Sequence, residues 1–241
     1  MPDLALAARA LHCAALALGV VDVYQTTREG AEARLQDALT RLGEIQLRMV
    51  MKALGDPPHV ENISAQAWRA IFDDLNGTIS PLLQDEYLAA AEEFLADSPI
   101  GVDWGLVNEN AAKWARIYTY ELVKGITNTT QDALREKVAG FFQNQMTLSQ
   151  LRDSIAPLFG DTRAVSIART EVTRAAVEGE NGVVNLIELE TGLEMEPIFQ
   201  TSRDDRVCPK CGPLNNKIVA SEDYPPLHVG CRCGLSHRFK R

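Results

Sequence analysis

The chain has 241 residues, of which 46% are hydrophobic and 24% are charged, and its formal net charge is −9. This is ordinary globular composition, and the length allows one large domain or two smaller ones whose cores need no crosslink. A protein that coats nucleic acid with its whole surface is excluded, because such binding requires Lys and Arg to neutralise phosphates. The charge is uneven: residues 196–241 carry eight basic and five acidic side chains, or +3, which leaves −12 for the remainder.

The apolar start of the chain predicts a packed Ala/Leu helix rather than a targeting or membrane segment. Asp3 stands where a signal peptide has Lys or Arg, and Arg9 interrupts the apolar run. The uninterrupted apolar stretch, residues 13–21, is too short to span a bilayer. We therefore expect no membrane contact and reduced cysteines that are available to a metal.

Helical spacing of apolar residues continues from residue 4 to about residue 190. The first helical segment is expected to end near residue 53, before the turn sequence GDPPH. Later helix starts are indicated by N-terminal capping residues, with Pro81 expected at a first helical position. The expected later helices are 63–75 (capped by Ser64), 80–96 (Ser80), 106–126, 128–145 (Thr129, Thr130), 146–159 (Thr147 or Ser149) and 162–190, the last weakened at Gly179 and Gly182.

After residue 190 the helical period is lost. The segments MEPIFQTS, KIVAS (217–221) and GLSHRF each have the composition of a short strand. The predicted fold class is therefore mainly α (α+β), with helical N-terminal and central regions and a small strand and loop segment at the C-terminus. Because that segment has few apolar residues, we expect a crosslink to stabilise it.

A cluster of cysteines in this C-terminal segment predicts a metal site. Cys208 and Cys211 form CPKC, a spacing that lets two thiolates face one ion, and HVGCRC follows with His228, Cys231 and Cys233. A structural tetrahedral zinc needs four ligands, so one of the five is expected to be spare. Of the two cysteines in CRC, only one is expected to bind easily unless the chain bends there.

The preferred zinc ligands are Cys208, Cys211, His228 and one of Cys231 and Cys233, with Cys233 favoured. His237 is a possible replacement ligand. Two alternatives stay open. The cysteines could be metal-free or paired in a disulfide, or the metal could be catalytic, with an open position and Asp204 or Asp205 as the base.

Three motifs in order resemble the phage minor head protein family, also called the phage Mu F-like or head morphogenesis domain. They are the helix and loop ending in KGITNTT, the helix FGDTRAVSIARTEVTRAAVEGE, and a C-terminal TSRDDRVCPKC followed by PPLHVGCRC. The resemblance covers about residues 102–238. It divides the chain into a variable helical region (1–100), the helical part of the head morphogenesis domain (101–190) and its cysteine-rich, metal-binding tail (191–241).

The resemblance implies a structural component of a tailed phage or prophage virion, not an enzyme. Such a protein is expected in several copies in the head interior or at the portal vertex, and in the host cytoplasm during assembly. Its implied partners are the portal protein and other capsid proteins, with possible contact to packaged DNA during packaging or ejection.

Two other functions compete with the virion role. Charged residues on the 162–190 helix, such as Arg169 and Glu171, could form an active-site array of an enzyme or toxin-related effector. They are better explained as ion pairs, with Thr170 and Glu171 facing the cysteine segment. A zinc-dependent nucleic-acid-binding module is less favoured, because only Tyr224 and Phe239 are aromatic near the cluster.

Overall fold

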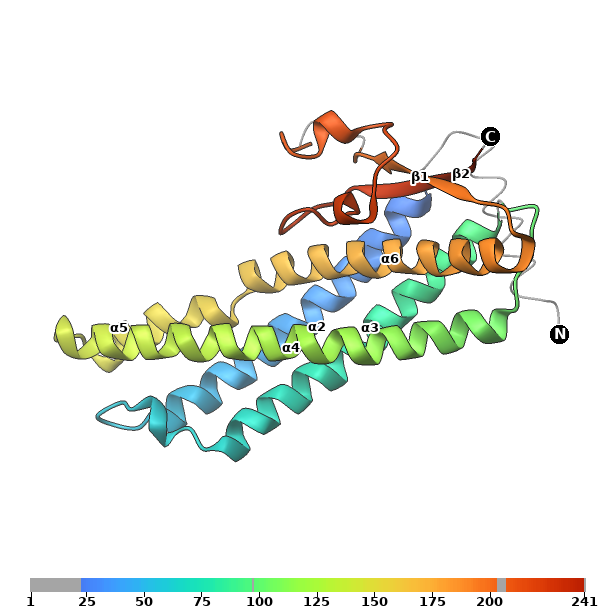
Figure 1. Ribbon diagram of the computed structural model, residues 1–241. Helices are drawn as coiled ribbons and strands as arrows, with labels where there is room; N and C mark the ends of the chain where they lie inside the picture. The colour runs from blue at the N-terminus through green and yellow to red at the C-terminus, as the bar shows by residue number, and fades with distance from the viewer. Residues whose placement is uncertain (1–22, 97, 203–206, 241) are drawn as a thin grey trace. The chain divides into compact units, whose positions relative to one another are not determined.

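A computed structural model describes residues 23–96, 98–202 and 207–240, and this part of the chain is mainly helical (Figure 1). Two strands near the C-terminus form a small antiparallel sheet. The predicted fold class is confirmed in this respect. The α-helices are α2 (Val23–Leu54), α3 (Ala65–Ala96), α4 (Trp104–Gln143), α5 (Leu148–Ile155) and α6 (Asp161–Thr191), and the strands are β1 (Met195–Gln200) and β2 (Gly234–Phe239).

Three of the expected helix features are confirmed. The Ser64 hydroxyl accepts a hydrogen bond from the Ala67 N–H (3.1 Å), as a capping residue does. Thr147 caps α5 through a reciprocal arrangement with Gln150, in which each side chain accepts a bond from the other residue's backbone N–H. The long helix expected over 162–190 is α6. Of the helix expected from residue 4, the part before Val23 lies outside the described residues.

The helix break expected at Ser80 is wrong, because α3 continues through it. A proline inside a helix normally collides with the carbonyl four residues earlier. The buried residues Ile79 and Leu83 keep the helical period across the proline, and their packing outweighs the local signal.

The break expected before Thr129 and Thr130 is also wrong, since α4 runs through both residues. Their hydroxyls do not cap a new helix. The Thr129 hydroxyl donates to the carbonyls of Gly125 and Ile126 (both 3.0 Å), and the Thr130 hydroxyl donates to Ile126 (2.7 Å). Bonds of this kind to the preceding turn let threonine sit inside a helix.

The chain forms two compact units, each discontinuous in sequence. The described residues of the first unit fall within Met1–Ala33, Asp85–Ala111 and Arg169–Arg241, and those of the second within Arg34–Gln84 and Ala112–Ala168. The second unit is helical and has a core of aliphatic side chains. Its fully buried members include Leu35, Ile79, Leu83, Leu134, Leu151 and Ile155. None of the described helices is both long enough and apolar enough to cross a membrane.

In the first unit, α6 packs against α3 through two glycines. A Cβ at Gly179 would collide with the carbonyl oxygen of Tyr87, and one at Gly182 would collide with the Tyr87 hydroxyl. Burial and the nearby charge of Glu178 raise the pKa of Tyr87 to about 12. α6 runs unbroken through both glycines, whose lack of a side chain permits the close packing.

The sheet of the first unit pairs Met195 with Phe239 at one end and Gln200 with Gly234 at the other. Two of the three predicted strands are therefore present. The third, 217–221, is reduced to a single bridge between Ile198 and Ile218, with bonds from the Phe199 N–H to the Lys217 carbonyl (2.9 Å) and from the Val219 N–H to the Pro197 carbonyl (3.1 Å).

Candidate metal centre

The first arm of the cluster is a tight turn that carries Cys208 and Cys211. The carbonyl of Cys208 accepts bonds from the N–H groups of Cys211 (3.1 Å) and Gly212 (3.0 Å). The Cys211 N–H also lies 3.3 Å from the Cys208 sulfur. This turn holds both side chains on the same side of the chain, which is the geometry that the CPKC spacing predicted.

The second arm is a turn that carries His228 and Cys231. The Cys231 N–H donates to the His228 carbonyl (3.1 Å), and Gly230 between them has φ +75°, a left-handed conformation that favours glycine. The chain is therefore bent ahead of β2. The sulfurs of Cys231 and Cys233 lie within 4.8 Å of each other and of the Cys211 sulfur.

The five donor atoms form two overlapping groups that share Cys211. In the first, the Cys208 sulfur lies 3.1 Å and the Cys211 sulfur 3.5 Å from Nε2 of His228. In the second, the sulfurs of Cys211 and Cys231 are 3.9 Å apart. A tetrahedral zinc with ordinary bond lengths separates two sulfurs by about 3.8 Å and a sulfur and a nitrogen by about 3.6 Å. The residues thus fit a zinc ion with little movement.

The hydrogen bonding of His228 suits a metal ligand. Its Nδ1 lies 2.9 Å from the Val229 carbonyl, which can only accept, so Nδ1 carries the proton. In the neutral ring the lone pair is then on Nε2, the atom that faces Cys208 and Cys211. A backbone carbonyl that fixes the tautomer in this way is usual behind zinc-bound histidines.

The electrostatics divide the four cysteines into two kinds. The Cys233 side chain, by hydrogen bonding, lowers the pKa of Cys231 to about 5, and the same contact raises the pKa of Cys233. The Cys211 N–H lowers the pKa of Cys208, whereas burial raises the pKa of Cys211 to about 12. Without a metal, Cys208 and Cys231 are therefore the preferred thiolates, and a bound dication would deprotonate any thiol that it coordinates.

The cluster is part of a small core and is closed to solvent on one side. Cys211, Cys231 and Cys233 are buried, as are their neighbours Val177, Phe199, Val219 and Leu235. Cys208 and His228 are only partly buried and complete the outer side. All four cysteines described are free thiols, so none of them forms a disulfide.

Other residues singled out from the sequence lie elsewhere. His237 belongs to neither donor group: its Nε2 lies 3.2 Å from Oδ1 of Asn181, and its ring meets Phe94 edge-on. Asp204 and Asp205 lie outside the described residues. Glu171 forms an ion pair with Arg174 (3.5 Å).

The stability of the fold is expected to fall as the pH is lowered from about 6.5 to about 4, because of His237. Burial lowers the pKa of His237 to about 4, so the unfolded chain binds its proton more readily than the folded chain. The contribution of neutral His237 to the free energy of unfolding is fully present above its pKa of about 6.5 in the unfolded chain. It is lost as the pH falls toward the pKa of about 4 in the folded chain. The loss has an upper limit of about 3 kcal/mol. Urea unfolding of the wild-type protein and of His237→Gln at pH 7 and pH 5 measures this effect. The free energy of unfolding should fall less between these pH values in His237→Gln than in the wild-type protein. An equal fall in both proteins would contradict the prediction.

Two contacts to the cluster were missed from the sequence. The Thr173 hydroxyl donates to the Cys231 carbonyl (2.8 Å), and the Arg28 guanidinium donates to the Cys233 carbonyl (3.5 Å). Thr173 lies three residues after Thr170, on the same face of α6, so helical spacing could have identified it. Nothing in the local sequence marks Arg28.

The fold and the site together define a helical protein with a small cysteine- and histidine-rich C-terminal sheet. Residues 126–236 match the family model described as Phage Mu protein F like protein. The match confirms the resemblance to the phage Mu F-like family that the motifs indicated, and it supports a phage head-related protein in general. The match includes both arms of the cluster. No curated protein and no solved structure matches the chain.

Proposed function

We propose that this protein is a phage or prophage minor head protein, a structural component that joins the portal vertex during head assembly. The observation that carries the proposal is the family match over residues 126–236. Its partners are the portal protein and other capsid proteins, and it is present in several copies per particle. It lies in the head interior or at the portal vertex and assists DNA packaging or ejection. It acts by binding and not as an enzyme.

The tail is proposed to hold one structural zinc ion. Cys208, Cys211 and His228 are three of its ligands, since their donor atoms lie together. The fourth is Cys231, whose sulfur is 3.9 Å from that of Cys211. Cys233, which the sequence favoured, then supports the Cys231 thiolate as a hydrogen-bond donor. Four protein ligands would leave no open position for a substrate, which favours a structural over a catalytic metal.

The zinc would give the tail a fixed shape for docking. Among the described residues, the core around the cluster has seven buried side chains, six from the tail and one from α6, and three of the six are the cysteines themselves. A core of that size gives little stability without a crosslink. A zinc ion joining the two arms would therefore decide whether the tail presents a defined surface to a partner.

The head-assembly role is tested by expressing the full chain with the portal and capsid proteins of the same phage and isolating heads on a density gradient. The chain is expected to sediment with portal-containing heads and to co-purify with the portal protein alone. Cys208→Ala should reduce both, because the tail would lose its metal.

Heads assembled without portal protein provide the control, and they should contain much less of the chain. The proposal is wrong if portal-containing heads lack the chain and the chain does not bind the portal protein. Incorporation that is the same with and without the portal protein would instead place the chain elsewhere in the head.

A further inference from the structure

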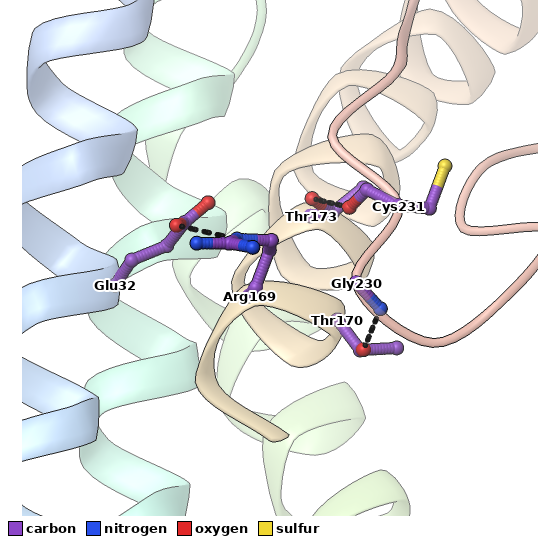
Figure 2. Close-up of polar contacts among 6 residues, drawn as sticks. All are labelled: Glu32, Arg169, Thr170, Thr173, Gly230 and Cys231. Atoms are coloured by element: carbon purple, nitrogen blue, oxygen red, sulfur yellow. Dashed lines mark hydrogen bonds and ion pairs between the residues drawn. The ribbon is translucent and has the colours of Figure 1, made fainter. Parts of the chain in front are cut away.

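Two threonine hydroxyls of α6 hold the turn that carries Cys231. The Gly230 N–H donates to Oγ1 of Thr170, and the Thr173 hydroxyl donates to the Cys231 carbonyl, both at 2.8 Å. Figure 2 shows the two side chains one turn apart on the helix, both directed at the same short stretch of loop. The loop is thus bound to the helix through its backbone.

The positions of these two bonds matter for the sulfur. One bond uses the backbone N–H of Gly230 and the other uses the backbone C=O of Cys231. The two bonds therefore hold the first and the last polar group of this dipeptide. Fixing both ends restricts the backbone dihedrals of Cys231 and hence the direction of its Cα–Cβ bond. That direction places the Cys231 sulfur 3.9 Å from the sulfur of Cys211.

The hydroxyls are buried, which makes each bond hard to replace. Thr173 is 0% exposed and Thr170 is 9% exposed, while Cys231 is 1% exposed. Water therefore has little access to the Cys231 carbonyl if the threonine donor is removed, and an unsatisfied buried group is unfavourable. Valine has nearly the shape of threonine, so packing alone does not require a hydroxyl at these positions.

Elsewhere in the described chain, threonine hydroxyls are used differently. Those of Thr130 and Thr191 donate to carbonyls four residues earlier in their own helices (both 2.7 Å). The Thr173 hydroxyl has one hydrogen to donate, and it is directed at the loop.

A charged contact lies beside the same turn. Nε of Arg169 is 3.5 Å from a carboxylate oxygen of Glu32 on α2, as drawn in Figure 2. A Cβ at Gly230 would lie 3.9 Å from Cδ of the same arginine. The stem of Arg169 therefore lines the left-handed turn, and residues 169–173 of α6 contact the turn at three points.

We propose that Thr170 and Thr173 are positioning residues of the zinc centre: their hydroxyls set the orientation of Cys231 toward the metal through the loop backbone. This inference rests on the zinc site proposed above. It predicts that the two hydroxyls control metal affinity and ligand geometry, beyond any effect on the stability of the fold.

The test is metal binding by the full chain and its variants Thr170→Val and Thr173→Val. Cobalt(II) reports ligand geometry through its visible absorption, and zinc affinity is measured by competition with a chelator. Each valine variant is expected to bind zinc about tenfold or more weakly, as for other groups that orient metal ligands, and to show altered cobalt bands. Thr173→Ser, which keeps the donor, should restore affinity and spectrum.

Thr119→Val is the matched control, because Thr119 is also 0% exposed and its hydroxyl has no hydrogen-bond partner among the described residues. It should leave metal binding unchanged. Far-UV circular dichroism identifies any variant that fails to fold. If Thr173→Val fails to fold, metal binding by Thr170→Val and Thr173→Ser still shows whether the hydroxyls control the metal site.

Two results would overturn the inference, and they differ in what else they affect. Valine variants with wild-type zinc affinity and cobalt spectrum, even with a lower melting temperature, would reduce the threonines to structural residues and leave the zinc proposal standing. A wild-type chain that binds neither metal would refute the zinc proposal, and the positioning role with it.

Discussion

The Cys208→Ala variant is expected to lose its zinc almost completely, whereas the wild-type chain purified without chelators should contain about one zinc ion. Cys208 supplies a donor atom 3.1 Å from Nε2 of His228, and its pKa is lowered by the Cys211 N–H. Without Cys208, only His228 remains on the outer side of the cluster, and the proposed set of four ligands is reduced to three. Metal analysis of the purified proteins measures the effect directly.

The loss of metal should also destabilise the tail. Structural zinc sites contribute on the order of 10 kcal/mol of apparent binding free energy at neutral pH, and this contribution would be lost with the metal. Added zinc should therefore raise the melting temperature of chelator-treated wild-type protein and leave that of Cys208→Ala unchanged.

The remaining cysteines separate the possible ligand sets. Cys231→Ala should lose the zinc as well, while Cys233→Ala should keep most of it, because Cys233 is proposed as a hydrogen-bond donor to Cys231. Cys13, which is far from the cluster in sequence, provides a control in Cys13→Ala. Loss of zinc in Cys233→Ala but not in Cys231→Ala would reverse the assignment, and zinc retained in Cys208→Ala would refute Cys208 as a ligand.

Most helices of this fold could be predicted because apolar spacing persists along the chain. What could not be predicted was where helices continue through local break signals. Ser80 and Pro81 resemble a helix start, yet Ile79 and Leu83 on either side are both fully buried. Whether such residues have a packing partner is a property of the tertiary structure, so a local signal cannot decide it.

The cluster was found from residue types and spacing alone, but its arrangement was not. The expectation that Cys231 and Cys233 come together only if the chain bends between them overlooked that residues i and i+2 of an extended chain lie on the same face; both sulfurs lie within 4.8 Å of the Cys211 sulfur. Likewise, Thr173 contacts the cluster from 58 residues away in sequence. Helical spacing places Thr173 on the same face of α6 as Thr170, but which loop carbonyl meets that face has no local signature.

The glycines of α6 illustrate the same limit, and they lead to the second large prediction. Gly179→Ala is expected to lower the free energy of unfolding by about 3 kcal/mol, the upper part of the usual range for overpacking. The added Cβ would meet the backbone carbonyl of Tyr87, which cannot rotate away, so α3 and α6 would have to separate locally. Urea unfolding followed by circular dichroism measures this change.

Two further glycines give a graded control for this prediction. Gly182→Ala should cost less, because the atom it meets is the hydroxyl end of the Tyr87 side chain, which can move. Gly125→Ala in α4 meets nothing within 4 Å and should stabilise the protein by about 0.5–1 kcal/mol, since alanine favours a helix more than glycine does. If Gly179→Ala and Gly125→Ala change stability equally, the close contact between α6 and Tyr87 does not exist. A loss confined to Gly179→Ala and Gly182→Ala would show that close packing, and not helix propensity, requires glycine at these positions.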